Sequence, residues 1–250
     1  MLKYNLAKQR MLEGKPAIGA AATLGVLGAE ALARAGFHYI LVDDQHSLWQ
    51  PEQIVHAFQV IRLAGGVPMA RVQKNDFGQI GAMLDRGALG IIVPMVNTVE
   101  QAQAAAFACR YPPRGGRSEG AYNVSMYGPE YSKRIDDEVF LAVQIETAEA
   151  AERAEEILSV DGVDGCWIGP ADLARSMGLQ PGAPEAEPAI QHVLDVCKRI
   201  GKIAGIACVG KGLPRMKQGF LFVTPASDYA FVANGAAAML QQFAAEGFLH

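Results

Sequence analysis

Short apolar runs alternate with longer helical stretches along almost the whole chain of 250 residues. A run such as Tyr39-Ile40-Leu41-Val42 is too short for a helix and has no polar face, which is typical of a buried strand. The predicted strands cover residues 16–24, 39–42, 67–72, 90–94, 140–145, 164–168, 203–208 and 220–224. The predicted helices cover residues 27–37, 51–64, 77–86, 99–109, 148–158, 189–200, 213–218 and 229–243. Strands that alternate with helices in this way form parallel sheets.

The number of strand–helix repeats decides between two parallel architectures. About eight repeats in a chain of this length are typical of a (β/α)₈ TIM barrel. An open, doubly wound sheet usually has a glycine-rich phosphate-binding fingerprint after its first strand, and none follows residues 16–24. Half of the residues are apolar, so the chain can bury a large core. The sequence therefore predicts an α/β protein with a single TIM-barrel domain over residues 1–250.

Charge and composition exclude several classes of protein. The net charge is -4 at neutral pH and no long basic run is present, which argues against a nucleic-acid-binding surface. No apolar stretch approaches the length of a membrane span. The first residues, up to Gly19, lack the apolar core of a signal peptide and predict a short amphipathic helix.

The cysteines indicate the compartment. The chain has four of them, scattered and without a CxxC pair, and several have apolar neighbours. They are Cys109, Cys166, Cys197 and Cys208. Buried free thiols in a reducing compartment are the simplest explanation, so we expect a cytoplasmic globular protein.

Two acidic residues end neighbouring predicted strands. Glu146 follows Val143-Gln144-Ile145, and Asp172 follows the strand at 164–168 through the turn Gly169-Pro170-Ala171. The ends of adjacent parallel strands lie side by side, so we expect the two carboxylates to converge. Two oxygen ligands with room for water and substrate suit a hard divalent cation such as Mg²⁺. Either residue alone could simply begin the helix that follows it, but for the pair we favour a metal site.

Other polar residues fall at the same predicted rim. Asp43 and His46 follow the second strand, Arg71 lies near the end of the third, and Gln144 lies in the fifth. Catalytic groups of a TIM barrel sit at the C-terminal ends of its strands. Each residue alone has an ordinary structural explanation: a hydrogen-bonded histidine, an aspartate that caps a turn, or an arginine in an ion pair. Their shared location is what predicts an active site.

Several segments, in a fixed order, carry a resemblance to a known family. They are Leu41-Val42-Asp43-Asp44-Gln45-His46-Ser47, Ala70-Arg71-Val72, Leu84-Asp85-Arg86-Gly87-Ala88, Ile91-Ile92-Val93-Pro94, Tyr111-Pro112-Pro113 with Gly115 and Arg117, Gln144-Ile145-Glu146-Thr147, and Gly162-Val163-Asp164 leading to Ile168-Gly169-Pro170-Ala171-Asp172-Leu173. On these segments the chain resembles the HpcH/HpaI family of metal-dependent, class II 2-oxo acid aldolases. It is similar to the 4-hydroxy-2-oxoheptanedioate and 2-keto-3-deoxy sugar acid aldolases of that family.

The resemblance implies a role for each residue at the predicted rim. Glu146 and Asp172 would hold a divalent cation (Mg²⁺, Mn²⁺ or Co²⁺), with water and the substrate's carboxylate and keto oxygens at the remaining positions. Arg71 would contact the keto oxygen, and His46, oriented by Asp43, would transfer protons. The pyruvate part would contact Gln144 and the backbone at Gly169, Ala171 and Asp172.

The implied reaction is the reversible cleavage of a 4-hydroxy-2-oxo acid to pyruvate and an aldehyde through a pyruvate enolate. Oxaloacetate decarboxylation shares this enolate and is an expected side activity. The resemblance also implies a homohexamer, a trimer of dimers with an exchanged C-terminal helix, in which Asp85 reaches a neighbouring subunit's site. The expected partners are therefore a 2-oxo acid, an aldehyde and further copies of the chain, with no nucleic acid and no membrane.

Two residues depart from the family's pattern. Gln45 stands where an acidic residue commonly precedes the histidine, which removes a negative charge near the expected metal's water shell. Ser118 stands where a glycine is usual, in a stretch (110–134) that we predict to be irregular and expect to face the aldehyde.

Three arginines of that stretch allow two interpretations. Arg110, Arg114 and Arg117 could bind an acidic tail of the aldehyde or form a solvated basic loop. For Arg110 and Arg114 we favour the solvated loop.

Three other functions stay open. A citrate-lyase-β-like or malyl-CoA-type lyase would share the barrel and the two carboxylates, but the short chain and the lack of an extended C-terminal lid region argue against it. A Schiff-base aldolase needs a buried lysine at a strand end, and Lys211 is the only nearby candidate. A non-catalytic 2-oxo acid binding protein is favoured by Gln45 alone.

Overall fold

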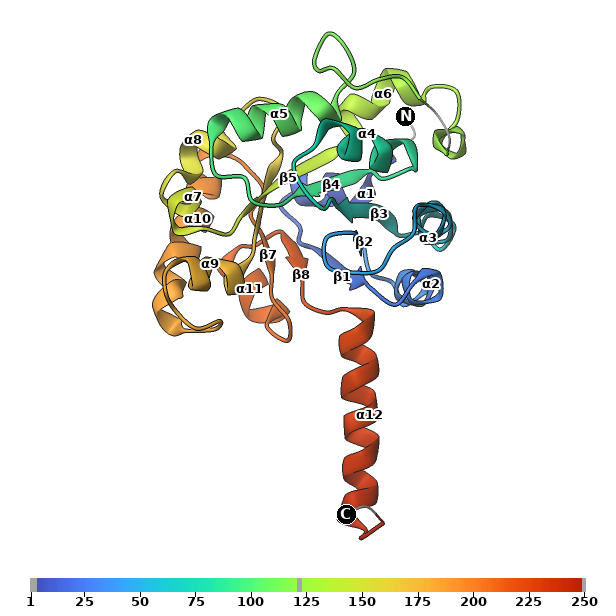
Figure 1. Cartoon of the computed structure of the whole chain (residues 1–250), viewed down its shortest axis with the longest axis vertical. Coiled ribbons are helices and arrows are strands. Elements are labelled where there is room, and N and C mark those ends of the chain that lie inside the picture. The colour runs from blue at the N-terminus through green and yellow to red at the C-terminus, as the bar shows by residue number, and fades with distance from the viewer. Residues whose placement is uncertain (1–3, 121–122, 249–250) are drawn as a thin grey trace.

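The computed structural model describes residues 4–120 and 123–248, and its centre is a closed barrel of parallel strands (Figure 1). Each strand pairs with the next along the chain, and β8 pairs with β1. The strands are β1 (Ala17–Ala22), β2 (Tyr39–Asp43), β3 (Val67–Arg71), β4 (Gly90–Val93), β5 (Phe140–Ile145), β6 (Gly165–Ile168), β7 (Gly205–Ala207) and β8 (Phe222–Thr224). The predicted (β/α)₈ barrel is confirmed.

Helices connect successive strands around the outside of the barrel (Figure 1). They are α2 (Val26–Arg34), α3 (Pro51–Leu63), α4 (Phe77–Asp85), α5 (Val99–Cys109), α6 (Tyr131–Glu138), α7 (Ala148–Glu152), α8 (Ala154–Leu158), α9 (Pro170–Ser176), α10 (Glu187–Ile200) and α11 (Gly212–Gln218), with α1 (Leu6–Leu12) before the first strand, α12 (Asp228–Ala245) after the last, and the 3₁₀ turns η1 (Val124–Tyr127) and η2 (Pro184–Ala186). Because each helix returns the chain to the start of the next strand, all C-terminal strand ends open on one mouth.

The N-terminal helix closes the barrel at the end opposite to that mouth. Asn5 caps α1, because its Oδ1 accepts a hydrogen bond from the backbone N–H of Lys8. Its Nδ2 donates a hydrogen bond to the carbonyl of Leu89 at 2.8 Å. Lys8 Nζ donates to the carbonyl of Val139 and lies 2.8 Å from Asp164. These bonds join α1 to the residues just before β4, β5 and β6.

Aromatic side chains fill the barrel near its N-terminal end. The ring centroids of Tyr39 and Phe222 are 4.6 Å apart, and those of Phe140 and Phe222 are 4.9 Å apart. The Tyr39 ring packs against the backbone of Gly19. A Cβ at Gly19 would lie 2.2 Å from the ring, so a larger residue would displace it. Burying each of these rings stabilises the fold by roughly 1.5–3 kcal/mol. The mouth is therefore a pocket with a packed floor and not a pore.

Two parts of the predicted secondary structure are wrong. The predicted helix 148–158 is two helices, because Arg153 (φ -97°, ψ 15°) leaves the helical conformation between α7 and α8. The stretch 110–134, predicted to be irregular, contains η1 and the start of α6. The rings of Tyr127 and Tyr131 stack there at 5.6 Å, so this stretch has a small buried cluster of its own.

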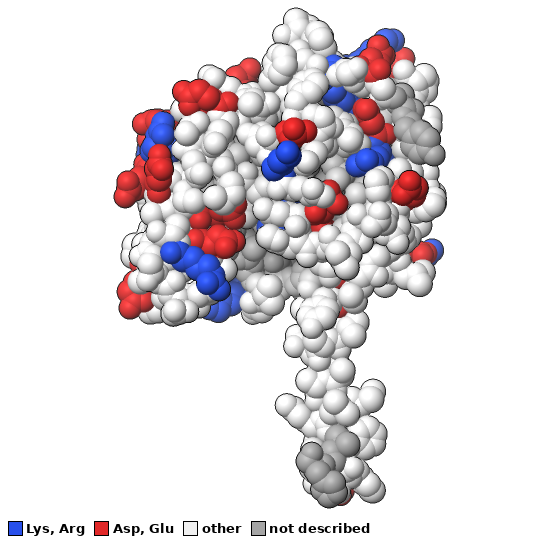
Figure 2. Space-filling model, viewed as in Figure 1, with Lys and Arg blue, Asp and Glu red and all other residues white. Residues whose placement is uncertain are grey.

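The last helix stands apart from the barrel. α12 projects from the end of β8 (Figure 1), and the part visible in Figure 2 carries almost no charged side chain. Its exposed apolar side chains include Tyr229, Phe231, Val232, Met239, Leu240 and Phe243. Within the described residues, neither α12 nor any other helix is long and apolar enough to cross a membrane.

The cysteines are buried and free, as predicted. Burial raises the pKa of Cys109 and the pKa of Cys208 to about 11, which keeps both thiols protonated near neutral pH. The sulfur atoms of Cys166 and Cys197 lie 3.6 Å apart between β6 and α10, within reach of a hydrogen bond, and form no disulfide.

Candidate active site

A buried ion pair joins the ends of β2 and β3 at the mouth of the barrel. In the parallel register Asp43 stands beside Arg71. Arg71 Nε donates to Asp43 Oδ1 at 2.8 Å, and Arg71 Nη2 donates to Oδ2 at 2.5 Å. Both side chains are only 9% exposed. Since Nε and Nη2 are committed to Asp43, Nη1 is the amino group of Arg71 that Asp43 does not engage.

Trp167 of β6 packs against the guanidinium of Arg71. The guanidinium carbon of Arg71 lies 5.1 Å from the centre of the Trp167 ring, a cation–π distance. The indole N–H of Trp167 donates to Thr224 Oγ1 at 3.1 Å, and Tyr39 lies 2.8 Å from the same hydroxyl. Arg71 is therefore held on a rigid platform that spans β2, β3, β6 and β8.

Glu146, immediately after β5, is buried and fixed by two N–H donors. Met95 donates its backbone N–H to Glu146 Oε1 at 2.8 Å. The side-chain amide of Gln144 donates to Oε2, while its own Oε1 is buried and has no hydrogen-bond partner among the described residues. Burial raises the pKa of Glu146 and the charge of Asp172 raises it further, against the lowering effects of the Met95 N–H and of Arg71.

The turn after β6 approaches Glu146 closely. Ile145 and Ile168 are register partners, and the backbone N–H of Gly169 donates to the carbonyl of Ile145 at 3.3 Å. A Cβ at Gly169 would lie 2.9 Å from Glu146 Oε2 and 2.9 Å from Gln144 Nε2. Only glycine fits here without displacing one of these side chains. Three residues later Asp172 lies exposed in the first turn of α9.

His46 and Ala171 lie at the same mouth but are exposed. His46 is in the turn after β2, and Ala171 is at the start of α9. The expectation that Asp43 orients His46 is not met in this conformation: among the described residues Asp43 bonds to Arg71 and to the Gln45 N–H (3.2 Å), and not to His46. The bidentate geometry of the guanidinium explains why Arg71 takes both carboxylate oxygens.

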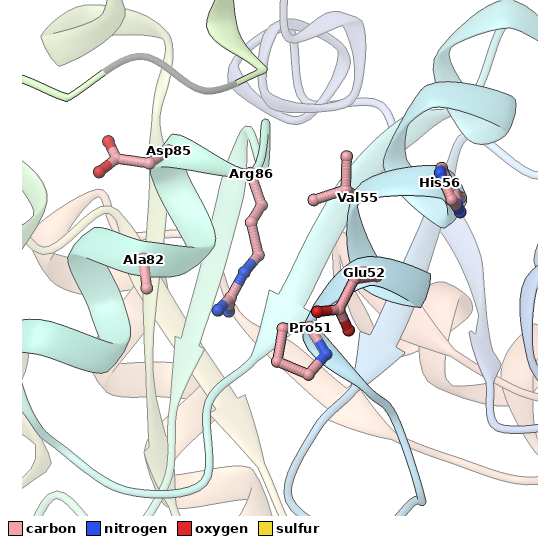
Figure 3. Close-up of a pocket in the computed structure, with 7 residues that line it drawn as sticks. All are labelled: Pro51, Glu52, Val55, His56, Ala82, Asp85 and Arg86. Carbon is pink, nitrogen blue, oxygen red and sulfur yellow. The ribbon is translucent and has the colours of Figure 1, made fainter.

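Asp85 is the predicted residue that does not join the site. It ends α4 and therefore lies toward the end of the barrel opposite to the mouth. Its Oδ1 accepts a hydrogen bond from Arg117 at 2.8 Å. Asp85 also lines a groove of about 470 Å³ between α3 and α4, together with Glu52, His56 and Arg86 (Figure 3). Its predicted contact with a neighbouring subunit stays a prediction.

Arg110 and Arg114 both pair with acidic residues of this chain. Arg110 is only 3% exposed and donates to the carbonyl of Gly162 and to Asp164, so the prediction of a solvated side chain is wrong for it. The guanidinium can be buried because these acceptors lie at the start of β6. Arg114 is half-exposed and pairs with Asp137 at 2.7 Å.

The donor set at the mouth fits a hard divalent cation. Among the described residues no group of three or more His, Cys, Asp or Glu side chains converges, so the chain offers two carboxylates, one buried and one exposed. Mg²⁺ is commonly held by one or two carboxylates and keeps several waters. The unpartnered Oε1 of Gln144 beside Glu146 is a ready acceptor for such a water.

Sequence reasoning missed two residues that shape the site. Met95 orients Glu146 through its backbone and has φ 53°, which is rare for a residue other than glycine. The proline before it marks the end of β4, but nothing in the sequence indicates a left-handed methionine. Trp167 was recognised only as part of a buried strand, because its contact with Arg71 depends on how the barrel closes.

Comparison with known proteins identifies the family. Residues 26–224 match the family model described as HpcH/HpaI aldolase/citrate lyase. The chain belongs to the HpcH/HpaI family. The predicted resemblance is therefore confirmed, and the family match extends past Leu173, where the recognised motifs end, to the end of β8.

Several known proteins are similar to this chain over most of their length. The hydroxypyruvate/pyruvate aldolase of Rhizorhabdus wittichii is 44% identical over 232 residues, covering 90% of this chain and 92% of that protein. The 4-hydroxy-2-oxo-heptane-1,7-dioate aldolase of Salmonella dublin is 36% identical over 253 aligned residues, covering 97% and 95%. The crystal structure of an HpcH/HpaI aldolase from Desulfitobacterium hafniense DCB-2 has a TM-score of 0.88 at 26% identity, covering 94% and 95%. The prediction that this HpcH/HpaI protein is a lyase of the aldolase type is confirmed.

Proposed function

We propose that this protein is a metal-dependent pyruvate aldolase, which cleaves a 4-hydroxy-2-oxo acid to pyruvate and an aldehyde and catalyses the reverse addition. The observation that carries the proposal is the buried, fixed carboxylate of Glu146 against the Gly169 turn that leads to Asp172, at the same mouth as the Asp43–Arg71 ion pair. Cleavage leaves the electrons of the broken C3–C4 bond on pyruvate as an enolate. Carboxylates that hold a cation, beside a fixed guanidinium, are suited to stabilise that charge.

The proposed metal ligands are Glu146 and Asp172, with Mg²⁺, Mn²⁺ or Co²⁺ as the cation. When bound, such a cation supplies a Lewis acid for the 2-oxo acid and neutralises the charge of the enolate. Glu146 is held in place for this role by the Met95 N–H and by Gln144. The exposed position of Asp172 leaves room for a small substrate to enter.

The remaining residues bind the substrate and move protons. Arg71 directs its Nη1 group to the keto oxygen, while Asp43 and Trp167 keep the guanidinium from turning away. Gln144 and the backbone at Gly169, Ala171 and Asp172 bind the pyruvate part.

His46 is the proposed base. It takes the proton of the C4 hydroxyl as the C3–C4 bond breaks and the aldehyde carbonyl forms, and a proton delivered to C3 then completes pyruvate. In the described part of the chain His46 is the only histidine that follows the C-terminal end of a strand. Because both carboxylate oxygens of Asp43 accept hydrogen bonds from Arg71, the proposed role of Asp43 is to fix Arg71 rather than to orient His46.

We also propose that the protein works as a homo-oligomer, a hexamer built from dimers that exchange α12. Support comes from the exposed apolar side chains of a helix that leaves its own barrel (Figure 1). Exposed apolar surface on this scale typically marks an interface.

The experiment that tests the function is pyruvate release from a racemic 4-hydroxy-2-oxo acid, measured with lactate dehydrogenase and NADH. We expect release that EDTA abolishes and that Mg²⁺, Mn²⁺ or Co²⁺ restores. Glu146→Ala and Asp172→Ala should each remove it, whereas Arg71→Ala should lose turnover but still bind the metal. Release that ignores EDTA and is stopped by borohydride in the presence of pyruvate would instead identify a Schiff base, with Lys211 as its candidate.

A further inference from the structure

A series of hydrogen bonds crosses the interior of the barrel next to Arg71. It begins at the indole N–H of Trp167 in β6, which donates to Thr224 Oγ1 in β8 at 3.1 Å. Thr224 Oγ1 lies 2.8 Å from the hydroxyl of Tyr39 in β2, and that hydroxyl donates to the carbonyl of Val223 at 2.7 Å. None of these four residues is more than 5% exposed. The series therefore links, inside the barrel, three strands that are not neighbours in the sheet.

The direction of these hydrogen bonds gives Thr224 two tasks. An indole N–H can only donate, and a tyrosine hydroxyl has a single proton. Because Tyr39 donates that proton to the Val223 carbonyl, Thr224 donates to Tyr39 and accepts from Trp167. Burial raises the pKa of Tyr39 well above its usual value, so its proton stays in place near neutral pH. Valine has the shape of threonine but no hydroxyl, so at position 224 it would leave the buried indole N–H without an acceptor.

Asp43 does not fix the guanidinium of Arg71 in every direction. The hydrogen bonds from Nε and Nη2 lie in the plane of the guanidinium, and they hold it against movement within that plane. The Trp167 ring covers the face of the guanidinium, with Cζ of Arg71 5.1 Å from the ring centre, and limits movement out of the plane. The direction of Nη1, which Asp43 does not engage, thus depends on where the Trp167 ring lies.

The hydrogen bond to Thr224 determines how the Trp167 ring is turned. The torsion that rotates an aromatic ring about its Cβ–Cγ bond has broad energy minima, so the side chain alone does not select one orientation. The bond from the indole N–H to Thr224 selects the orientation in which this edge of the ring points to β8. On the other side, the register partner of Trp167 is Gln144, whose amide is already bound to Glu146. Among the described hydrogen bonds, the one to Thr224 is the only one that the Trp167 side chain makes.

We propose that Thr224 is a positioning residue for the cleavage reaction: by holding the indole of Trp167, it sets where Arg71 directs Nη1 toward the keto oxygen. This inference rests on the proposed function and adds to it a residue that has no contact with the substrate. The keto oxygen gains negative charge as it becomes the enolate oxygen, so its interaction with Nη1 is stronger in the transition state than in the bound substrate. A misdirected Nη1 therefore lowers kcat more than it raises KM.

The first test compares kcat and KM of two variants at Thr224. Pyruvate release from a racemic 4-hydroxy-2-oxo acid is measured with Mg²⁺ in the lactate dehydrogenase assay. We expect Thr224→Val to lower kcat about tenfold or more and to change KM less than about threefold, because a displaced catalytic group affects mainly the chemical step. Thr224→Ser keeps the hydroxyl and should restore most of the wild-type kcat.

The second test asks whether Thr224 acts through Trp167. Trp167→Phe keeps an aromatic face for Arg71 but has no N–H that needs an acceptor. We expect this variant to lower kcat by itself, and we expect Thr224→Val to lower kcat less than about twofold further in the Trp167→Phe background, because residues that act as one unit are not additive. The thermal unfolding midpoints of the same four proteins should show the same non-additivity.

Trp49→Phe is the matched control for the loss of a buried hydrogen bond. Trp49 is the second of the two tryptophans and is 7% exposed. Its indole N–H donates to the carbonyl of Ala22 at 3.1 Å, the same length as the bond from Trp167 to Thr224. Trp49→Phe should lower the unfolding midpoint about as much as Trp167→Phe does but keep the wild-type kcat. All kinetics are measured well below the lowest midpoint, so that every variant is folded.

The remaining outcomes separate failure of the inference from failure of the proposed function. If the wild type turns over and Thr224→Val has the same kcat, or raises only KM, Thr224 does not position Arg71. A loss of kcat that is equally large in the Trp167→Phe background, or in Trp49→Phe, overturns the inference as well. If the wild type releases no pyruvate with any divalent cation, the proposed function is overturned, and the positioning of a catalytic Arg71 with it.

Discussion

Gly169 determines how closely the end of β6 approaches Glu146. Its φ is -97°, so alanine is compatible with the backbone, and only the added Cβ conflicts with Glu146 and Gln144. We predict that Gly169→Ala displaces Glu146 and lowers kcat/KM at least about 100-fold, the usual effect of losing a fixed electrostatic group. Gly81→Ala, where a Cβ would meet nothing within 4 Å, is the matched control and should keep full activity. Equal activity of the two variants would show that the approach at Gly169 is not needed.

The pair Asp43–Arg71 is a second feature at the residue scale. Asp43→Ala leaves a buried guanidinium without its partner, which should cost roughly 3–5 kcal/mol of stability and abolish turnover. The double variant Asp43→Leu/Arg71→Met removes both charges and should recover most of the stability but none of the activity. Urea unfolding and the pyruvate-release assay separate the two effects. Recovery of activity in the double variant would contradict the role of Arg71.

At the scale of an element, the segment just after β4 has a rare backbone conformation at Met95, which directs the Met95 N–H to Glu146. Met95 is half-exposed, so its side chain contributes little, whereas its backbone N–H bonds Glu146. Met95→Gly should therefore keep activity and keep stability within about 1 kcal/mol, because glycine adopts φ 53° without strain. Met95→Val, β-branched at the same φ, should lose both metal affinity and thermal stability. Similar behaviour of the two variants would mean that this conformation does not matter.

The elements that the sequence predicted well are those fixed by local patterns. The ends of β2 and β5 lie within one residue of the predicted ends, because the apolar runs there stop at Asp43 and Glu146, and both residues therefore lie at one mouth. Helix α5 matches its predicted bounds, since Thr98 and Gln101 form a capping box. Local signals of this kind need no knowledge of the rest of the fold.

The features that could not be predicted depend on contacts between distant segments. The break at Arg153 has no proline or glycine to mark it. Arg110 is buried because Gly162 and Asp164, more than 50 residues further along the chain, present acceptors to it. The bond of Asp43 to Arg71 rather than to His46 follows from the register of β2 against β3, which the sequence alone does not give.

At the scale of the whole molecule, we expect further copies of the chain to cover the exposed apolar side chains of α12. Its apolar side chains are about half-exposed or more, and its charged residue Asp228 lies at its first position. We predict a mass well above the 26.7 kDa of one chain by multi-angle light scattering. Val232→Glu with Leu240→Glu should shift the protein to smaller species, whereas Gly81→Ala should not. A wild type that elutes as a monomer would contradict the proposed assembly.

The most direct test of the central claim, a cation site built on Glu146 and Asp172 that stabilises the pyruvate enolate, needs no aldehyde. It is the exchange of the pyruvate methyl protons with deuterium in D₂O, followed by ¹H NMR. We predict exchange with Mg²⁺, Mn²⁺ or Co²⁺ added in turn, its loss with EDTA, and its loss in Glu146→Gln and Asp172→Asn even with metal in excess. Exchange that continues at the wild-type rate in EDTA, or in Glu146→Gln, would contradict the claim.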